Sequence, residues 1–217
     1  MTIDNQPEIV EINGWVFRIQ SPPQRTSPAQ VMLLLHGHLG NENAMWILAN
    51  PLPQKYHFLA PRAPKKMGNE QYSWHAISPQ WPEINTYRDM AVELIKSVDQ
   101  WLKQQGLSDI KLDLLGFSQG AVMAYALAIL FPERIGRVAA IAGFIPKDWQ
   151  TQLDHNLFAD QVFFVSHGNQ DEIIPIKKAR QTAQWIEQHG GQVTFCDAEI
   201  GHKISANCFN GLGEFFS

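Results

Sequence analysis

The stretch LLGFSQGAVMAYAL, residues 114–127, decides how this chain folds. Its first apolar residues end a predicted buried strand at 110–116, and its last ones lie in a predicted buried helix at 119–130. Between them stands GFSQG, residues 116–120, which matches the pattern G-x-S-x-G. Glycine on both sides of the serine permits a very tight turn, because the flanking chain segments approach each other closely. The stretch therefore predicts a strand, a sharp turn and a helix, with the Ser118 hydroxyl at the tip.

The segment from residue 114 to residue 132 has no charged side chain, and its length would suit a membrane span. Glycine, serine and glutamine occupy its first third, however. A strand and a helix buried inside a globular core account for the segment better. The sequence therefore predicts no membrane span.

Strands and helices alternate from one end of the chain to the other. Short apolar runs indicate strands, and apolar residues spaced three and four apart indicate helices. The predicted strands are 8–12, 15–19, 31–35, 56–60, 110–116, 138–141, 161–166 and 193–196, and the predicted helices are 42–49, 87–105, 119–130, 175–188 and 204–216. Such alternation is typical of a three-layer α/β protein, in which helices cover both faces of a mostly parallel central sheet.

The chain shows no internal boundary, so residues 1–217 are predicted to form a single domain. Residues 1–30 would supply N-terminal edge strands and a loop. Residues 62–86 show no regular periodicity and are expected to form an irregular, aromatic loop. Residues 142–160 must already cross the sheet, which takes a dozen or more residues, so no cap domain is expected there.

Composition excludes several classes of protein. Hydrophobic residues make up 45% of the 217 and charged residues 18%, which is typical of a globular protein and not of a disordered one. The net charge of −4 and the lack of a basic cluster argue against a nucleic-acid partner. The first residues carry acids and no apolar segment, so no signal peptide is predicted and a cytoplasmic location is expected. Cys196 and Cys208 are accordingly interpreted as two buried, reduced thiols.

A serine is a weak nucleophile at neutral pH and needs a base that a carboxylate orients. In parallel sheets the reactive side chains gather beyond the carboxyl ends of the strands. Asp171 follows the predicted strand 161–166, and His202 follows the predicted strand 193–196. This gives the chain order serine, acid, histidine that the fold requires. We therefore predict a catalytic triad of Ser118, Asp171 and His202.

Two members of this triad have competitors in the sequence. Glu172 could replace Asp171 as the acid, although the apolar residues after it are expected to turn inward. His167 and His189 could replace His202 as the base. His167 precedes the acid and His189 stands at a helix end, so both are interpreted as loop or surface histidines.

An oxyanion hole requires two backbone N–H groups directed at the developing charge. Gln119 supplies one, because it directly follows the nucleophile. The other should come from HGHLG, residues 36–40, with His38 as the first choice and Leu39 as the second. The two histidines of that segment lack a third ligand at a usable spacing, and no HExxH, CxxC or phosphate-binding glycine motif occurs. Neither a metal nor another cofactor is therefore expected.

Taken together, these segments resemble the phospholipase/carboxylesterase family of small α/β-hydrolases, which includes the acyl-protein thioesterases. The resemblance covers residues 31–216, and five segments carry it: LLLHGHLGNEN, LLGFSQGAVMAYAL, IAGFIP, SHGNQDEIIPI and GHKIS. It implies the α/β-hydrolase fold. The site residues that it implies are Ser118, Asp171 and His202, with the backbone N–H groups of His38 and Gln119.

The resemblance also implies an activity. It is the hydrolysis of carboxylic esters through an acyl-enzyme, on short- to medium-chain or lysophospholipid-like substrates. A thioesterase acting on acyl-proteins or acyl-carriers would share the same triad, and a non-catalytic binding protein of this fold is a more remote alternative. The partner is a small-molecule ester, with a homodimer left open. The predicted walls of the substrate pocket are Leu39, Met67, Trp74, Trp81, Phe117 and Phe144.

Overall fold

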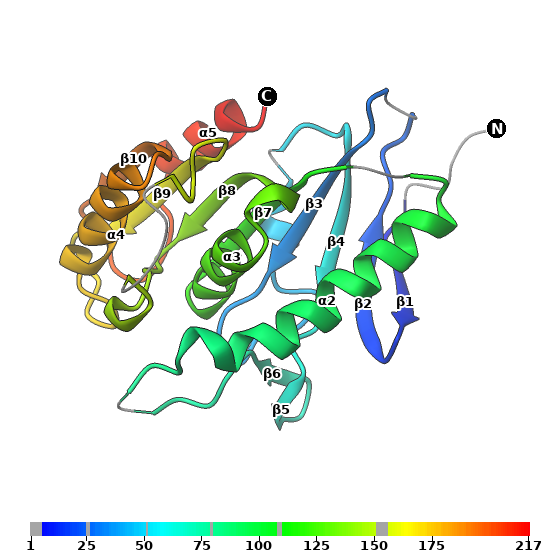
Figure 1. Cartoon of the computed structure of the whole chain (residues 1–217), viewed down its shortest axis with the longest axis horizontal. Coiled ribbons are helices and arrows are strands. Elements are labelled where there is room, and N and C mark those ends of the chain that lie inside the picture. Colours follow the sequence, from blue (N-terminus) through cyan, green and yellow to red (C-terminus); the bar gives the residue numbers. More distant parts are fainter. Residues whose placement is uncertain (1–5, 25–26, 51, 79, 108–109, 151–155) are drawn as a thin grey trace.

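A sheet of eight strands runs through the centre of the fold (Figure 1). The computed structural model describes residues 6–24, 27–50, 52–78, 80–107, 110–150 and 156–217, so residues 1–5 and 25–26 of the predicted N-terminal region lie outside it. Within the described residues the strand order is β1-β2-β4-β3-β7-β8-β9-β10. The strands are β1 (Glu8–Ile12), β2 (Trp15–Gln20), β3 (Gln30–Leu35), β4 (Tyr56–Pro61), β7 (Leu112–Phe117), β8 (Ile135–Ile141), β9 (Val162–Gly168) and β10 (Gln192–Ala198).

The sheet is mostly parallel, as the sequence predicts. In the sheet order, every neighbouring pair from β4 through β3, β7, β8 and β9 to β10 is parallel. Strand β2 is the exception, because it pairs antiparallel with both β4 and the edge strand β1. The central strands are apolar on both faces because both faces are covered, and every residue of β3 after Gln30 is buried. The carboxyl ends of β3, β7, β8 and β9 consequently meet at one edge, where functional side chains are expected.

Helices lie on both sides of the sheet and complete three layers (Figure 1). They are α1 (Trp46–Ala49), α2 (Ile84–Gln104), α3 (Gln119–Leu130), α4 (Ile176–Gln188) and α5 (Ala206–Phe215). Helices α2, α3 and α4 pack into one apolar core with Leu33 and Leu35, and α1 and α5 pack into a second with Met32 and Leu34. Alternate residues of a strand point to opposite faces, so the two cores lie on opposite sides of the sheet. The predicted three-layer fold is confirmed.

Helix α3 accounts for the long uncharged segment of the sequence. It packs against β7, β8 and α2, and its residues from Gln119 to Ile129 are all buried. An all-apolar surface is therefore what its position requires. In the described part of the chain, no helix is both long and apolar enough to cross a membrane.

Two local predictions are wrong. The helix expected at 42–49 is reduced to α1, because Glu42 turns inward and pairs with Arg62 at 2.7 Å. The loop expected at 62–86 contains an antiparallel hairpin of β5 (Lys65–Gly68) and β6 (Gln71–Ser73). The residues of β5 are mostly exposed, so the apolar alternation that marks a half-buried strand is absent from the sequence.

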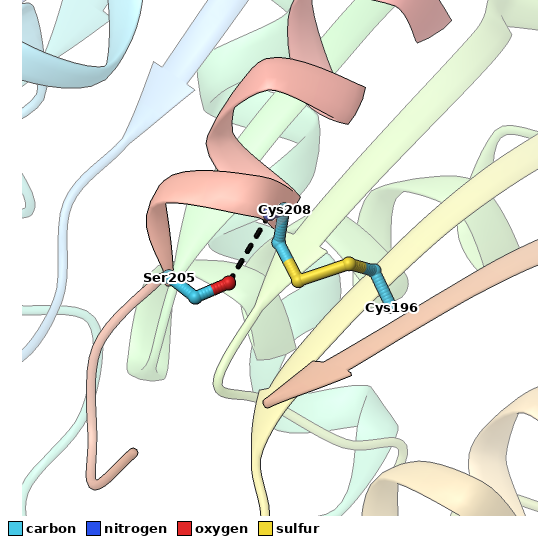
Figure 2. Close-up of a disulfide and its surroundings, with 3 residues drawn as sticks. All are labelled: Cys196, Ser205 and Cys208. Atoms are coloured by element: carbon cyan, nitrogen blue, oxygen red, sulfur yellow. Dashed lines mark hydrogen bonds between the residues drawn. A yellow bond between two sulfur atoms is a disulfide. The ribbon is translucent and has the colours of Figure 1, made fainter. Parts of the chain in front are cut away.

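The expectation of two reduced thiols is also wrong, because Cys196 and Cys208 form a disulfide (Figure 2). Cys196 lies in β10 and Cys208 in the first turn of α5, with 5.7 Å between their Cα atoms. Ser205 caps that turn, since its Oγ accepts a hydrogen bond of 3.1 Å from the Cys208 N–H (Figure 2). The pairing depends on how the loop between β10 and α5 folds back. The spacing of the two cysteines in the sequence does not reveal it.

Candidate active site

Ser118 occupies the turn between β7 and α3, with φ 52° and ψ −117°. Residues other than glycine rarely adopt such a conformation, which persists only where the surrounding structure fixes it. A Cβ at Gly116 would lie 2.4 Å from the Gly120 carbonyl oxygen, and a Cβ at Gly120 would lie 2.0 Å from the Leu35 carbonyl oxygen. Both positions therefore require glycine. The turn holds the Ser118 hydroxyl at the carboxyl edge of the sheet.

The three predicted triad side chains meet at this edge. Nε2 of His202 lies 2.8 Å from Oγ of Ser118, and Nδ1 of His202 lies 2.7 Å from Oδ2 of Asp171. Asp171 follows β9, and His202 lies in the loop between β10 and α5. With Nδ1–H donating to the carboxylate, Nε2 is left to accept the serine proton. The geometry is that of a serine, a base and the group that orients the base.

The carboxylate of Asp171 is buried and held in its ionised form. Burial raises the pKa of a carboxyl group, but the hydrogen bonds to Asp171 outweigh this effect and leave its pKa below the usual value. Oδ1 accepts hydrogen bonds of 2.9 Å from the N–H groups of Ile173 and Ile174, and Oδ2 accepts one from His202. An ionised carboxylate here orients the imidazole and would stabilise an imidazolium.

The competing acid lies outside this arrangement. Glu172 is exposed, although it adjoins Asp171 in sequence. Of the two apolar residues that follow it, Ile174 turns inward as expected, whereas Ile173 is 71% exposed, contrary to the expectation. The N–H of Ile173 is what matters at this point, because it donates to the Asp171 carboxylate.

The two competing histidines differ from each other. His189 stands at the end of α4, as the sequence suggests. The interpretation of His167 as a loop or surface residue is wrong, because it lies in β9 and is buried. Its Nε2 is 2.7 Å from the Ile174 carbonyl oxygen and 3.3 Å from Oδ2 of Asp171, so it supports the acid. Within the described residues, no three His, Cys, Asp or Glu side chains form a group that could hold a metal ion.

The loop after β3 lies against the serine. A Cβ on Gly37 would lie 3.4 Å from the Cβ of Ser118. The N–H groups of His38 and Gln119 have no acceptor among the described residues, whereas the N–H of Leu39 donates to Ser73 Oγ at 3.3 Å. Two N–H groups are thus available for an oxyanion. They belong to Gln119 and His38, the two residues that the sequence analysis gives as first choices.

An apolar groove with a volume of about 670 Å³ adjoins the triad. Its lining includes Phe117 and Lys203, which are the chain neighbours of Ser118 and His202, respectively. Leu39 also lines the groove and is 42% exposed. Exposed apolar side chains along a groove indicate a site for an apolar ligand. Two of the predicted pocket residues, Leu39 and Phe117, therefore lie where an acyl chain could bind.

The other predicted pocket residues lie elsewhere. Trp81 and Phe144 line a second depression of about 590 Å³. Trp74 is buried in the core, where its indole N–H donates to the His36 carbonyl oxygen at 2.7 Å. Met67 is 41% exposed on β5. None of these four side chains lines the groove beside the triad.

Comparison with known proteins identifies the family. A family model described as phospholipase/carboxylesterase matches residues 16–217. The chain belongs to this family. It is 28% identical over 186 residues to acyl-protein thioesterase 1 of Kluyveromyces lactis, a match that spans 76% of this chain and 80% of that protein. It is 29% identical over 206 residues to the esterase YpfH of Escherichia coli, spanning 87% and 81%.

A solved structure supports the fold of this family member. The carboxylesterase of Bacillus cereus matches with a TM-score of 0.81 at 19% sequence identity, and the match covers 92% of each chain. At that identity the likeness shows the fold alone. With the family match, it confirms the predicted α/β-hydrolase fold and the assignment to the ester hydrolases.

Two polar side chains that support the site in this family member are missed by sequence reasoning. Ser73 is fully buried and contacts the loop after β3. The side chain of Gln119 is also buried: its Oε1 accepts from the Trp74 N–H at 2.8 Å, and its Nε2 donates to the His75 carbonyl oxygen at 3.0 Å. In the sequence, each of the two is only a polar residue within or beside an apolar run. That pattern does not reveal what the side chain contacts.

Proposed function

We propose that Ser118, His202 and Asp171 form the catalytic triad of a carboxylic-ester hydrolase that works through an acyl-enzyme. The observation that supports this most is the unbroken chain of two hydrogen bonds, 2.8 Å and 2.7 Å, from the serine through the imidazole to a buried carboxylate. The strained turn at the serine is a second support, since strain is kept where the surroundings and the chemistry require it.

The proposed reaction proceeds in two steps. His202 takes the proton from Ser118 as the Oγ attacks the ester carbonyl, and the N–H groups of His38 and Gln119 bind the oxyanion of the tetrahedral intermediate. His202 then gives the proton to the departing alcohol, which leaves the acyl group on Ser118. In the second step, His202 takes a proton from water as the water oxygen attacks the acyl-enzyme, and it returns this proton to Ser118 Oγ as the carboxylic acid leaves.

The groove beside the triad indicates the substrate class. Leu39, Ile47, Phe117 and Phe209 present apolar surface in it, and Lys203 lies at the same groove. We propose short- to medium-chain or lysophospholipid-like esters, with the acyl chain along the apolar lining. Each methylene that becomes fully buried should improve kcat/KM by up to about 0.8 kcal/mol, and the gain should end where the chain reaches solvent.

A thioesterase acting on acyl-proteins or acyl-carriers is the second candidate. The observation that favours it is the similarity to proteins named acyl-protein thioesterase 1, and the same triad would attack a thioester carbonyl. A non-catalytic binding protein is a third and more remote candidate. The bonded triad argues against it, because a binding protein has no need of those three side chains in that order.

A panel of p-nitrophenyl esters from acetate to palmitate, paired with thioesters of the same acyl groups, tests the proposal. We expect kcat/KM to rise with chain length to a maximum at medium length, with oxyesters preferred. A consistent preference of more than tenfold for thioesters would establish the second candidate instead. No turnover of any member, together with no reaction with a fluorophosphonate, would establish the third.

Three further predictions from the sequence also become proposals. We propose that residues 1–217 form one domain, that the protein can form a homodimer, and that it is cytoplasmic. The disulfide between Cys196 and Cys208 makes the last of these worth testing first, because disulfides persist mainly in oxidising compartments. Fractionation of the producing cells under thiol-blocking conditions would test both the location and the pairing.

A further inference from the structure

We propose that Ser73 is a positioning residue that fixes the loop after β3 and thereby selects the His38 N–H as an oxyanion donor. The inference rests on the proposed function and adds a residue to it. Ser73 ends β6, far in sequence from both the triad and the loop, and its side chain is fully buried. No part of the G-x-S-x-G pattern points to it.

The hydroxyl of Ser73 makes two hydrogen bonds to consecutive residues of the loop. Its Oγ lies 2.6 Å from Nδ1 of His38 and 3.3 Å from the backbone nitrogen of Leu39. A hydroxyl has one proton to donate and lone pairs to accept with. The Leu39 N–H can only donate, so Ser73 accepts from it, and the tautomer of the His38 imidazole sets the direction of the second bond. One side chain thus holds both the backbone and the imidazole of this loop.

The bond to Leu39 decides which N–H group remains available. Leu39 has φ 61°, in the left-handed region that side chains other than Asn and Asp seldom adopt. In this conformation its N–H is directed at Ser73, whereas the N–H of His38 has no acceptor among the described residues. The Gly40 N–H also closes this turn by donating to the Gly37 carbonyl oxygen at 3.1 Å, and the Ser73 hydroxyl adds the hydrogen bond that fixes the direction of the Leu39 N–H.

The segment around Ser73 also reaches the second donor. The N–H of Tyr72 donates to the Gly40 carbonyl oxygen at 2.9 Å, and the N–H of Trp74 donates to Oε1 of Gln119 at 2.8 Å. Three consecutive residues therefore connect the loop that carries His38 to the residue that follows the nucleophile. Ser73 stands in the middle of this connection, so its side chain helps set the spacing of the two donors.

The variant Ser73→Ala tests the inference. We expect kcat to fall about 10- to 100-fold with KM changed less than 3-fold, because displaced oxyanion donors affect the transition state more than the bound ester. The inhibition constant of a trifluoromethyl ketone, which forms an oxyanionic adduct with the serine, should rise by the same factor as kcat/KM falls. Rates are normalised by titrating active sites with a fluorophosphonate.

Ser97→Ala is the matched control. Ser97 is also fully buried, and its Oγ donates to the Glu93 carbonyl oxygen at 2.9 Å within α2, away from the site. The Ser97→Ala variant loses a buried hydroxyl as Ser73→Ala does, and its kcat should stay within twofold of the wild type. If Ser73→Ala does not fold, Ser73→Cys replaces it, since a thiol of similar shape bonds only weakly.

The possible outcomes distinguish a failure of this inference from a failure of the proposed function. The role of Ser73 is overturned if kcat of Ser73→Ala falls less than 5-fold, or if it falls further without a matching rise in the inhibition constant of the ketone. Neither result would contradict the proposed hydrolase activity. A wild-type protein that neither hydrolyses esters nor reacts with the fluorophosphonate overturns the proposed function itself.

Discussion

Breaking the disulfide should destabilise the fold and slow catalysis together. The bond closes the segment from Cys196 to Cys208, and His202 lies at the middle of that segment. Ile204, Ser205 and Ala206 of the same segment line the groove. The crosslink therefore restrains both the proposed base and one wall of the proposed acyl site.

The size of the effect follows from the length of the closed loop. The cysteines are 12 residues apart, and the chain-entropy argument gives about 3 kcal/mol for a loop of that size. In a protein of this length, each kcal/mol shifts Tm by about 2–4 °C, so reduction should lower Tm by about 6–12 °C. A displacement of His202 by about 1 Å can cost up to about 100-fold in rate, and we expect kcat to fall roughly tenfold.

Thermal unfolding and active-site-normalised kcat, each with and without a phosphine reductant, measure the two effects. The double variant Cys196→Ala/Cys208→Ala is the control. It should behave like the reduced protein and should not respond to the reductant. Two free thiols in protein purified without reductant would refute the pairing. Full reduction with Tm lowered by less than 2 °C and kcat unchanged would refute the argument that the bond restrains the His202 loop.

Four other predictions follow from the site. Gly120→Ala should unfold the protein or lower Tm by more than 10 °C, because the added Cβ has no room. In the control Gly211→Ala the added Cβ would meet only ordinary contacts, so melting curves should show Tm within 3 °C of the wild type. Asp171→Asn should lower kcat on the order of 10⁴-fold in steady-state assays while the protein still folds, and a loss below tenfold would remove Asp171 from the mechanism. Because the pKa of Asp171 is lowered in the fold, its carboxylate stabilises the protein fully above the unfolded pKa of about 3.9, and this stabilisation is lost as pH falls through the lower folded value. The free energy of unfolding of the wild type, measured with urea, should therefore approach that of Asp171→Asn below about pH 4. Since a histidine base must be neutral to accept a proton, kcat/KM should fall as the solution is made acidic, and a profile flat to below about pH 5 would exclude a histidine base.

The features that could be predicted from the sequence are those with a local physical cause. The turn at Ser118 is visible because two glycines are sterically required within five residues. The alternation of strands and helices is visible because burial on one or two faces sets a period in the chain. Once the strands are placed, the predicted acid and base must directly follow strands whose carboxyl ends lie at the same edge as Ser118. Few residues besides Asp171 and His202 meet this condition.

The features that could not be predicted depend on contacts between distant segments. Ser73 is one serine in an irregular stretch until the fold places its hydroxyl against His38 and Leu39. The disulfide depends on how a loop folds back onto β10. The position of Trp74, an expected pocket residue, could not be predicted for the same reason. A tryptophan in an aromatic loop is equally apolar whether it lines a groove or, as here, packs in the core.

Reaction with a fluorophosphonate probe followed by mass spectrometry tests the central claim most directly. The account predicts a single adduct on Ser118 of the wild-type protein, and neither an adduct nor turnover in Ser118→Ala, whose Tm should stay within about 2 °C because the Oγ bonds only to His202 among the described residues. An adduct on another residue, or more than about a hundredth of the wild-type kcat in Ser118→Ala, would contradict the assignment of Ser118 as the nucleophile.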